Sequence, residues 1–274
     1  MSHVGTTLRR LRLESGLSLR DLARRLGVSS AYLSRVEHGL DAAPTPERLE
    51  AIAAELGLPA SLLIEVGHRV SPFVERYLEQ EPQAAALFFE IASRGLGAEE
   101  LAEVQRYVAR RWPKRVALED DAGTHRLAPL LDDERVVLGL HCDALEDAYE
   151  IASARLASLP RMPDASVLAE AFRAREEEVG AGVGAGVGVL CAAVAGAQPC
   201  AAVVLLARPL ANDAPDADPL SVLVLLAAPS RGRDPMLRVA HVARLAGRGM
   251  ASALREVERS EAVLQRIALL ELVE

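Results

Sequence analysis

The sequence predicts a multidomain protein with an all-α N-terminal domain, a helical middle segment and an α/β C-terminal domain built on a mixed sheet. Three observations lead to this fold class. Leucines recur at helical spacing, punctuated by serine and glycine, as far as about residue 66. A second helical pattern covers residues 70–113, and apolar strands alternate with helices from about residue 127. The 274 residues, 50% of them hydrophobic, suffice for two domains with separate cores.

The changes of pattern predict where the domains begin and end. The polar stretch that closes the middle segment reads PKRVALEDDAGTHR, which is typical of a linker. We therefore expect an N-terminal domain over residues 1–68, a helical connector over 69–113, a linker over 114–126 and an α/β domain over 127–274.

Charge is distributed unevenly along the chain. The net charge is −8, yet residues 1–38 contain seven arginines against three acids. This excludes a protein that is coated with basic residues throughout. A basic N-terminal segment on an acidic chain instead indicates contact with phosphate at one end only.

The cysteines and the apolar runs indicate a compartment. Cys142, Cys191 and Cys200 show no metal-binding spacing, so we expect no metal, no cofactor and a reducing cytoplasm. Arg9 and Arg10 interrupt any apolar stretch of the kind that opens a signal peptide. No apolar run reaches the roughly 18–20 residues that cross a bilayer, so no membrane partner is expected.

Helix start and stop signals divide the N-terminal domain into short helices. Leu8 and Leu11 mark a first helix that ends near Gly16. Ser18 can cap the start of a second helix, and Gly27 can end it because glycine adopts positive φ at little cost.

Three more helices follow the glycine turn. The third runs from Ser29 through Val36, and Gly39 closes it. The fourth begins at Thr45-Pro46-Glu47, which supplies a capping residue, a proline at the first position and an acid in the first turn. A fifth short helix reaches about Val66. Two short helices joined by a glycine turn within a five-helix unit constitute a helix-turn-helix.

The stretch Leu17–Gly39, LSLRDLARRLGVSSAYLSRVEHG, resembles the Xre/Cro family of phage-type repressors. The similarity covers residues 6–66 and includes the Leu-Ala pair of the second helix, the glycine turn and the Glu-x-Gly ending. It implies a DNA-binding domain that reads double-stranded DNA. It also implies that Arg12 and Glu37 form a structural ion pair between the first and third helices.

The DNA-reading residues are expected on the exposed face of the third helix, which would enter the major groove. Arg35 can form a bidentate pair with guanine. Tyr32 either packs or reaches a phosphate, and Arg20 and Arg24 are candidates for backbone contact. The remaining expected contacts are Ser29, Ser30, Ala31 and Ser34.

One such domain offers too small a surface for tight specific binding, so we expect a homodimer on a palindromic operator. The middle segment carries two apolar helical stripes, Val74/Tyr77/Leu78 and Leu87/Phe88/Phe89/Ile91. These stripes are interpreted either as a dimerisation arm or as a surface packed against the DNA-binding domain. An alternative for the whole protein is an interaction module that does not bind DNA.

The C-terminal domain is predicted from apolar runs that alternate with amphipathic segments. The strands show no polar alternation, which indicates a sheet covered on both faces. The predicted strands are 136–140, 186–191, 201–207 and 220–227, and the predicted helices are 145–159, 167–178, 235–246 and 261–272.

The order of these elements over 127–272 resembles the enzyme IIA domain of the fructose/mannitol class in the bacterial sugar phosphotransferase system. Arg175-Glu176 precedes a run whose glycines at 182, 184 and 186 match the family pattern. Cys191 stands where the family carries its phosphoacceptor histidine, and Pro235 or Met236 stands at the second histidine position. The same glycine run fails as a dinucleotide motif because no strand precedes it and no helix follows it.

The resemblance implies a degenerate IIA-like domain with no catalytic residues, so we expect no enzyme activity. Such a domain would sense a small molecule or dock a phosphotransferase protein. The sequence thus predicts a dimeric, sequence-specific transcription regulator. An alternative is a phosphotransferase component that accepts a phosphoryl group on Cys191.

Overall fold

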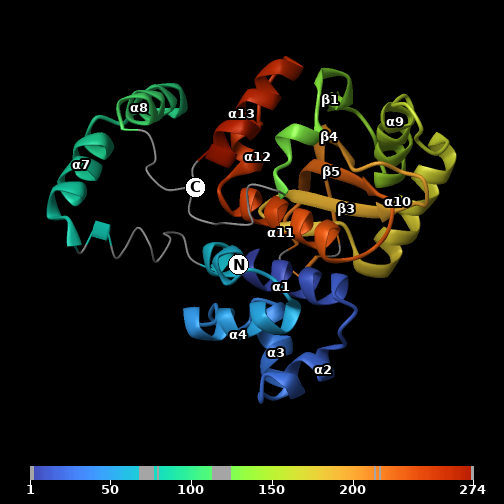
Figure 1. The fold of residues 1–274 in the computed structure, drawn as a ribbon, viewed down its shortest axis with the longest axis horizontal. Coiled ribbons are helices and arrows are strands. Elements are labelled where there is room, and N and C mark those ends of the chain that lie inside the picture. The colour runs from blue at the N-terminus through green and yellow to red at the C-terminus, as the bar shows by residue number, and fades with distance from the viewer. Residues whose placement is uncertain are drawn as a thin grey trace.

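The computed structural model describes residues 3–67, 77, 78, 80–112, 125–212, 214, 215 and 217–272. It has an N-terminal helical domain, two further helices and a C-terminal domain in which a five-stranded mixed sheet lies between helices (Figure 1). The predicted fold class is therefore confirmed. No helix among the described residues is long and apolar enough to cross a bilayer.

The N-terminal domain contains the five predicted helices. They are α1 (His3–Glu14), α2 (Leu19–Arg25), α3 (Ser30–Glu37), α4 (Pro46–Leu56) and α5 (Ala60–Gly67). The Ser18 hydroxyl accepts a hydrogen bond from the backbone N–H of Asp21 at 3.1 Å, and Ser29 does the same for Tyr32. Gly27 makes the turn between α2 and α3 at a φ of +65°. Local capping therefore fixes both ends of this turn.

One detail of the fourth helix was predicted wrongly. Thr45 lies at the start of α4, but its side chain makes no capping bond to the helix backbone. Its hydroxyl instead bonds the Glu47 side chain, an interaction that contributes to lowering the pKa of Glu47 after the bond to that residue's own backbone. The helix still begins at Pro46, whose fixed φ suits the first helical position.

The middle segment contains α7 (Pro82–Ser93) and α8 (Ala98–Arg111). Gly95, at a φ of +60°, turns the chain between them, and a Glu100 carboxylate oxygen accepts from the Gly97 backbone N–H at 3.0 Å. We call α7 and α8 together the arm. Val74, part of one predicted stripe, lies outside the described residues.

The strands of the C-terminal domain form a sheet in the order β1-β4-β5-β3-β2. β1 is parallel to β4 and β3 to β5, whereas β4–β5 and β2–β3 are antiparallel. The strands are β1 (Val136–Leu140), β2 (Gly182–Gly184), β3 (Val187–Ala193), β4 (Cys200–Leu210) and β5 (Leu220–Ala228). The helices are α9 (Leu145–Ala157), α10 (Ala165–Val179), α11 (Arg233–Gly247), α12 (Met250–Ala253) and α13 (Ser260–Leu272), with two 3-10 turns at Ala128–Leu130 and Asp133–Arg135.

The two faces of this sheet are covered differently. One face packs on α9 and α10 through buried side chains such as Tyr149 and Phe172. The other packs on α11 and also on α1 of the N-terminal domain (Figure 1). Apolar side chains of α1, including Leu8 and Leu11, belong to the same buried cluster as Val189 of β3. The two domains therefore share one continuous core.

Two parts of the C-terminal domain differ from the prediction. The glycine run was expected to hold a single strand from residue 186, but it forms a hairpin in which Gly184 and Gly186 take φ values of +111° and +74°. His125, expected in the linker, is buried, with Nδ1 3.0 Å from a carboxylate oxygen of Asp234. A partner far along the chain holds it in the domain.

Candidate nucleic-acid interface and domain seam

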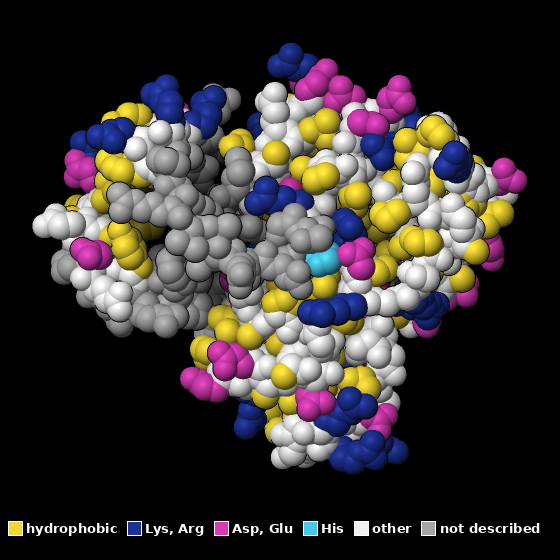
Figure 2. Space-filling model, viewed as in Figure 1, with side chains coloured by type: hydrophobic (Ala, Val, Ile, Leu, Met, Phe, Trp, Pro, Cys, Tyr) yellow, Lys and Arg dark blue, Asp and Glu magenta, His cyan; other side chains and the backbone are white. Residues whose placement is uncertain are grey.

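The turn formed by α2 and α3 lies at the end of the molecule away from the sheet (Figure 1). Figure 2 shows basic side chains, with acidic ones among them, at this end. Tyr32 and Ser34 are half-buried, and the other expected DNA-reading residues are exposed: Arg20, Arg24, Ser29, Ser30, Ala31 and Arg35. The chain therefore leaves this surface open to a partner.

Acidic neighbours hold two of the expected contact arginines. Arg35 donates from Nε and Nη2 to one carboxylate oxygen of Asp41 at 3.0 and 2.8 Å, and this bond raises the pKa of Arg35. Arg24 Nη2 lies 2.7 Å from an Asp21 oxygen. Both guanidinium groups stay charged, and contact with guanine requires Arg35 to exchange its carboxylate partner for a base edge.

Arg48 is a basic residue at this surface that sequence reasoning missed. Its guanidinium carbon lies 5.2 Å from the centre of the Tyr32 ring, which is a cation–π distance. The contact joins the start of α4 to α3, and no local spacing in the sequence signals it. Arg48 therefore extends the basic surface beside the third helix and orients Tyr32.

The predicted ion pair between the first and third helices is present. Arg12 Nε and Nη2 donate to the two carboxylate oxygens of Glu37 at 2.7 and 2.8 Å, and both residues are buried. Nearby, a Cβ on Gly5 would come within 2.4 Å of the Val36 carbonyl oxygen, so only glycine allows this approach of α1 to α3. The position of α3 is therefore fixed by α1.

On its other side α1 contacts the C-terminal domain, and we call this contact the domain seam. The Thr7 hydroxyl donates to the Val183 carbonyl oxygen at 2.7 Å, and the Arg10 guanidinium donates to the Gly180 carbonyl oxygen. A second contact joins α5 to α11, where Arg248 Nη2 lies 2.6 Å from a Glu65 carboxylate oxygen.

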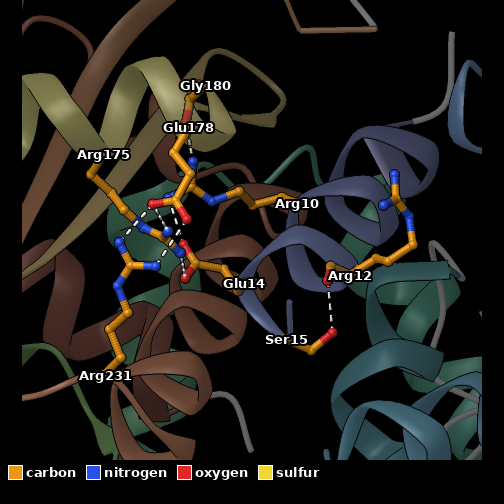
Figure 3. Close-up of polar contacts among 8 residues, drawn as sticks. All are labelled: Arg10, Arg12, Glu14, Ser15, Arg175, Glu178, Gly180 and Arg231. Carbon is orange, nitrogen blue, oxygen red and sulfur yellow. Dashed lines mark hydrogen bonds and ion pairs between the residues drawn. The ribbon is translucent and has the colours of Figure 1, made fainter. Parts of the chain in front are cut away.

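Five charged side chains form a chain of ion pairs along the seam (Figure 3). Arg10 lies 2.8 Å from Glu14 on the same helix, and Glu14 also pairs with Arg175 of α10. Arg175 reaches Glu178 at 2.6 Å, and Arg231 donates to both oxygens of Glu178 at 2.9 and 2.6 Å. The pKa of Glu178 falls to about 2, first because of the bond from Arg231 and then because of Arg175. The sequence analysis missed this cluster.

Cys191 lies in β3, on the sheet face that α1 covers, and is 7% exposed. Burial raises the pKa of its thiol to about 12, and the negative charge of Glu14 acts in the same direction. The thiol is therefore protonated near neutral pH, and a thiol is a much weaker nucleophile than a thiolate.

His241 is buried inside α11. Its Nε2 lies 2.8 Å from a Glu271 oxygen, and its Nδ1 lies 2.8 Å from Arg244 Nη2. Glu271 also accepts from the backbone N–H groups of Leu127 and Ala128. This histidine thus helps to join α11 and α13 to the start of the domain.

Comparisons with known proteins agree with the N-terminal geometry. Residues 8–63 match the family model described as helix-turn-helix. The HTH-type transcriptional regulator SinR of Bacillus subtilis is 34% identical over 65 residues, which is 24% of this chain and 59% of that protein. The transcriptional regulator ClgR of Mycobacterium tuberculosis is 41% identical over 69 residues, 25% of this chain and 61% of that protein. The chain thus spans about three fifths of the length of these relatives.

The C-terminal half is similar to solved structures of another kind. The nitrogen regulatory protein IIA-Ntr from Neisseria meningitidis has a TM-score of 0.44 at 26% identity, covering 51% of this chain and 97% of that chain. A chain described as a PTS IIA domain from Streptococcus pyogenes has a TM-score of 0.45 at 22% identity, covering 52% and 94%. The protein carries an Xre-type helix-turn-helix domain at its N-terminus, followed by a C-terminal half to which solved IIA structures are similar.

Proposed function

We propose that the protein is a sequence-specific DNA-binding transcription regulator. The observation that carries the proposal is the exposed face of α2 and α3, where Arg20 and Arg35 point outward on a domain that matches the helix-turn-helix model. Arginines here can neutralise phosphates, which supplies most of the affinity, and read base edges, which supplies specificity. The printed names of two partial relatives, both transcriptional regulators, support the same proposal.

We further propose that the active form is a homodimer that joins through the arm and binds a palindromic site. Leu87, Phe88 and Phe89 of α7 are 60%, 56% and 74% exposed, and Trp112 after α8 is 60% exposed. Grouped exposed aromatic side chains are typical of interfaces. Their exposure favours the dimerisation arm over packing against the DNA-binding domain.

The C-terminal domain, in this proposal, is a platform for regulation and no phosphoryl carrier. A phosphoacceptor must present a nucleophile to its donor, whereas the Cys191 thiol is buried, and its pKa is about 12. A small-molecule ligand or a phosphotransferase protein remains the proposed source of the regulatory signal.

The test is selection of bound duplexes from a random pool, followed by titrations at two salt concentrations. We expect one enriched palindromic site. Arg35→Ala should reduce discrimination at one base pair by about 1–3 kcal/mol, whereas Arg20→Ala should weaken all duplexes about equally and lower the salt dependence. Arg155→Ala, an exposed change on α9, is the control and should alter neither. If no duplex is enriched, the protein is an interaction module instead.

The phosphoryl-acceptor alternative has a separate test. The protein is incubated with labelled phosphoenolpyruvate and the general phosphotransferase carrier proteins. We expect no stable label. Label that appears on Cys191 and is lost in Cys191→Ser would contradict the proposed role of the C-terminal domain.

A further inference from the structure

The domain seam buries charge to a degree that is unusual for a contact between two domains. Arg10 is 1% exposed, Arg175 is 5% exposed, and the Glu14 side chain between them is 8% exposed. Long charged side chains are rarely buried unless they are paired. The seam is therefore built around the one carboxylate that faces both arginines.

The remainder of the ion-pair chain shows that Arg175 belongs to a preformed site on the C-terminal domain. Glu178 on the same helix orients Arg175, and Arg231 in turn holds Glu178. Arg231 is 66% exposed and Glu178 is 45% exposed, so this end of the chain faces solvent. The buried end reaches the other domain and ends on Glu14 (Figure 3).

We propose that Glu14 of the DNA-binding domain is the bound carboxylate of an arginine site on the C-terminal domain. By occupying this site, Glu14 keeps α1 on the sheet, covers Cys191 and holds the DNA-binding domain in one orientation. This inference goes beyond the proposed function and does not depend on DNA binding.

The electrostatics explain why one carboxylate controls the contact. Desolvation and the charge of Arg175 both lower the pKa of Arg10, and Glu14 opposes them. Without the Glu14 charge, two buried guanidinium groups face each other across the seam with no carboxylate between them. Like charges in a medium of low dielectric repel strongly, and each group regains hydration if the domains separate.

The three cysteines supply the readout because each reports a different event. Cys191 lies on the sheet face covered by α1, so its thiol becomes accessible when the seam opens. Cys200 is buried on the opposite face and becomes accessible only when the C-terminal domain itself unfolds. Cys142 is half-buried and calibrates the reagent.

The experiment measures the rate of N-ethylmaleimide labelling of each cysteine in the full chain near neutral pH, resolved by peptide mass spectrometry. Glu14→Arg should accelerate the labelling of Cys191 by about tenfold or more and leave Cys200 protected. Glu14→Gln, which keeps the side-chain shape, should produce a smaller acceleration. Glu50→Arg is the matched control, because it makes the same change of charge at an exposed position of α4 and should leave all three rates unchanged.

A charge exchange completes the test. Arg175→Glu added to Glu14→Arg restores an opposite-charge pair across the seam and should slow the labelling of Cys191 again. The proposal is overturned if Cys191 in folded Glu14→Arg reacts no faster than in the parent protein. If Glu14→Arg exposes Cys200 as well, Glu14→Gln decides: faster labelling of Cys191 alone supports the proposal, and an unchanged rate overturns it.

Discussion

The domain seam and the arm reverse the usual placement of side chains. In the seam, Arg10 and Arg175 are almost fully buried, whereas on the arm Phe88 and Phe89 are more than half exposed. The buried charges have partners within this chain. The aromatic side chains of the arm are open to another molecule. The comparison indicates that the seam is a completed interface and that the arm is one half of an interface.

The largest expected effect is at the buried end of the seam. Arg175→Ala leaves the Glu14 carboxylate buried with one guanidinium fewer, and we expect the free energy of unfolding to fall by about 3–5 kcal/mol. Urea denaturation measures it. Arg173→Ala on the same helix removes a more exposed pair with Glu170 and should cost less than about 1 kcal/mol. Equal losses in the two variants would mean that the seam contributes no more than a surface pair.

The next largest effect is expected on the arm. Phe89→Asp places a charge in the proposed dimer interface and should weaken dimerisation by about 2 kcal/mol, while the stability of the monomer changes by about 0.5 kcal/mol or less. Sedimentation velocity over a concentration series measures the dimer. Val167→Asp, at a 48% exposed position of α10, is the control. Should Phe89→Asp destabilise the fold and leave association intact, the arm packs within its own chain.

A smaller effect is expected where α5 meets α11. Arg248→Ala removes the ion pair with Glu65, in which both side chains are 21% exposed, so we expect a loss of about 1 kcal/mol. Thermal unfolding at two salt concentrations checks this, because a partly exposed pair weakens with added salt. A loss as large as that of Arg175→Ala would show that burial does not distinguish the two contacts.

The smallest effect concerns pH. The folded-state pKa of Glu178 is about 2, below its ordinary 4.5, so its contribution to stability is present above pH 4.5 and is lost as the pH falls toward 2. Because Glu178 and Arg231 are substantially exposed, this contribution should stay below about 1 kcal/mol. Arg231→Ala should therefore lower stability at neutral pH, and its difference from the parent should shrink toward pH 2. A difference that grows in acid would contradict this assignment.

The helix-turn-helix could be predicted because its determinants are local. Ser18 and Ser29 cap helices within three residues, and Gly27 supplies the positive φ of the turn. The ion pair of Arg12 with Glu37 joins residues 25 apart, and only the family resemblance pointed to it. Its presence in the structure supports that resemblance.

The domain seam could not be predicted because its partners are distant in sequence. Glu14 and Arg175 are separated by 161 residues, and Arg10 and Gly180 by 170. The spacing of Arg10 and Glu14 is that of an ordinary pair on the surface of a helix. Nothing local reveals that this pair is buried. The glycine hairpin was missed for a related reason, since its residues lack the alternation that identifies a short strand.

The position of α1 has a consequence for how this protein is divided. Leu8 and Leu11 contribute to a core that continues across the boundary between the two domains. A fragment that ends after α5 would lose part of the apolar surroundings of its own first helix and would expose Arg10 and Glu14 to water. The DNA-binding module is therefore not an interchangeable cassette, and heat or denaturant should melt both halves in a single cooperative transition.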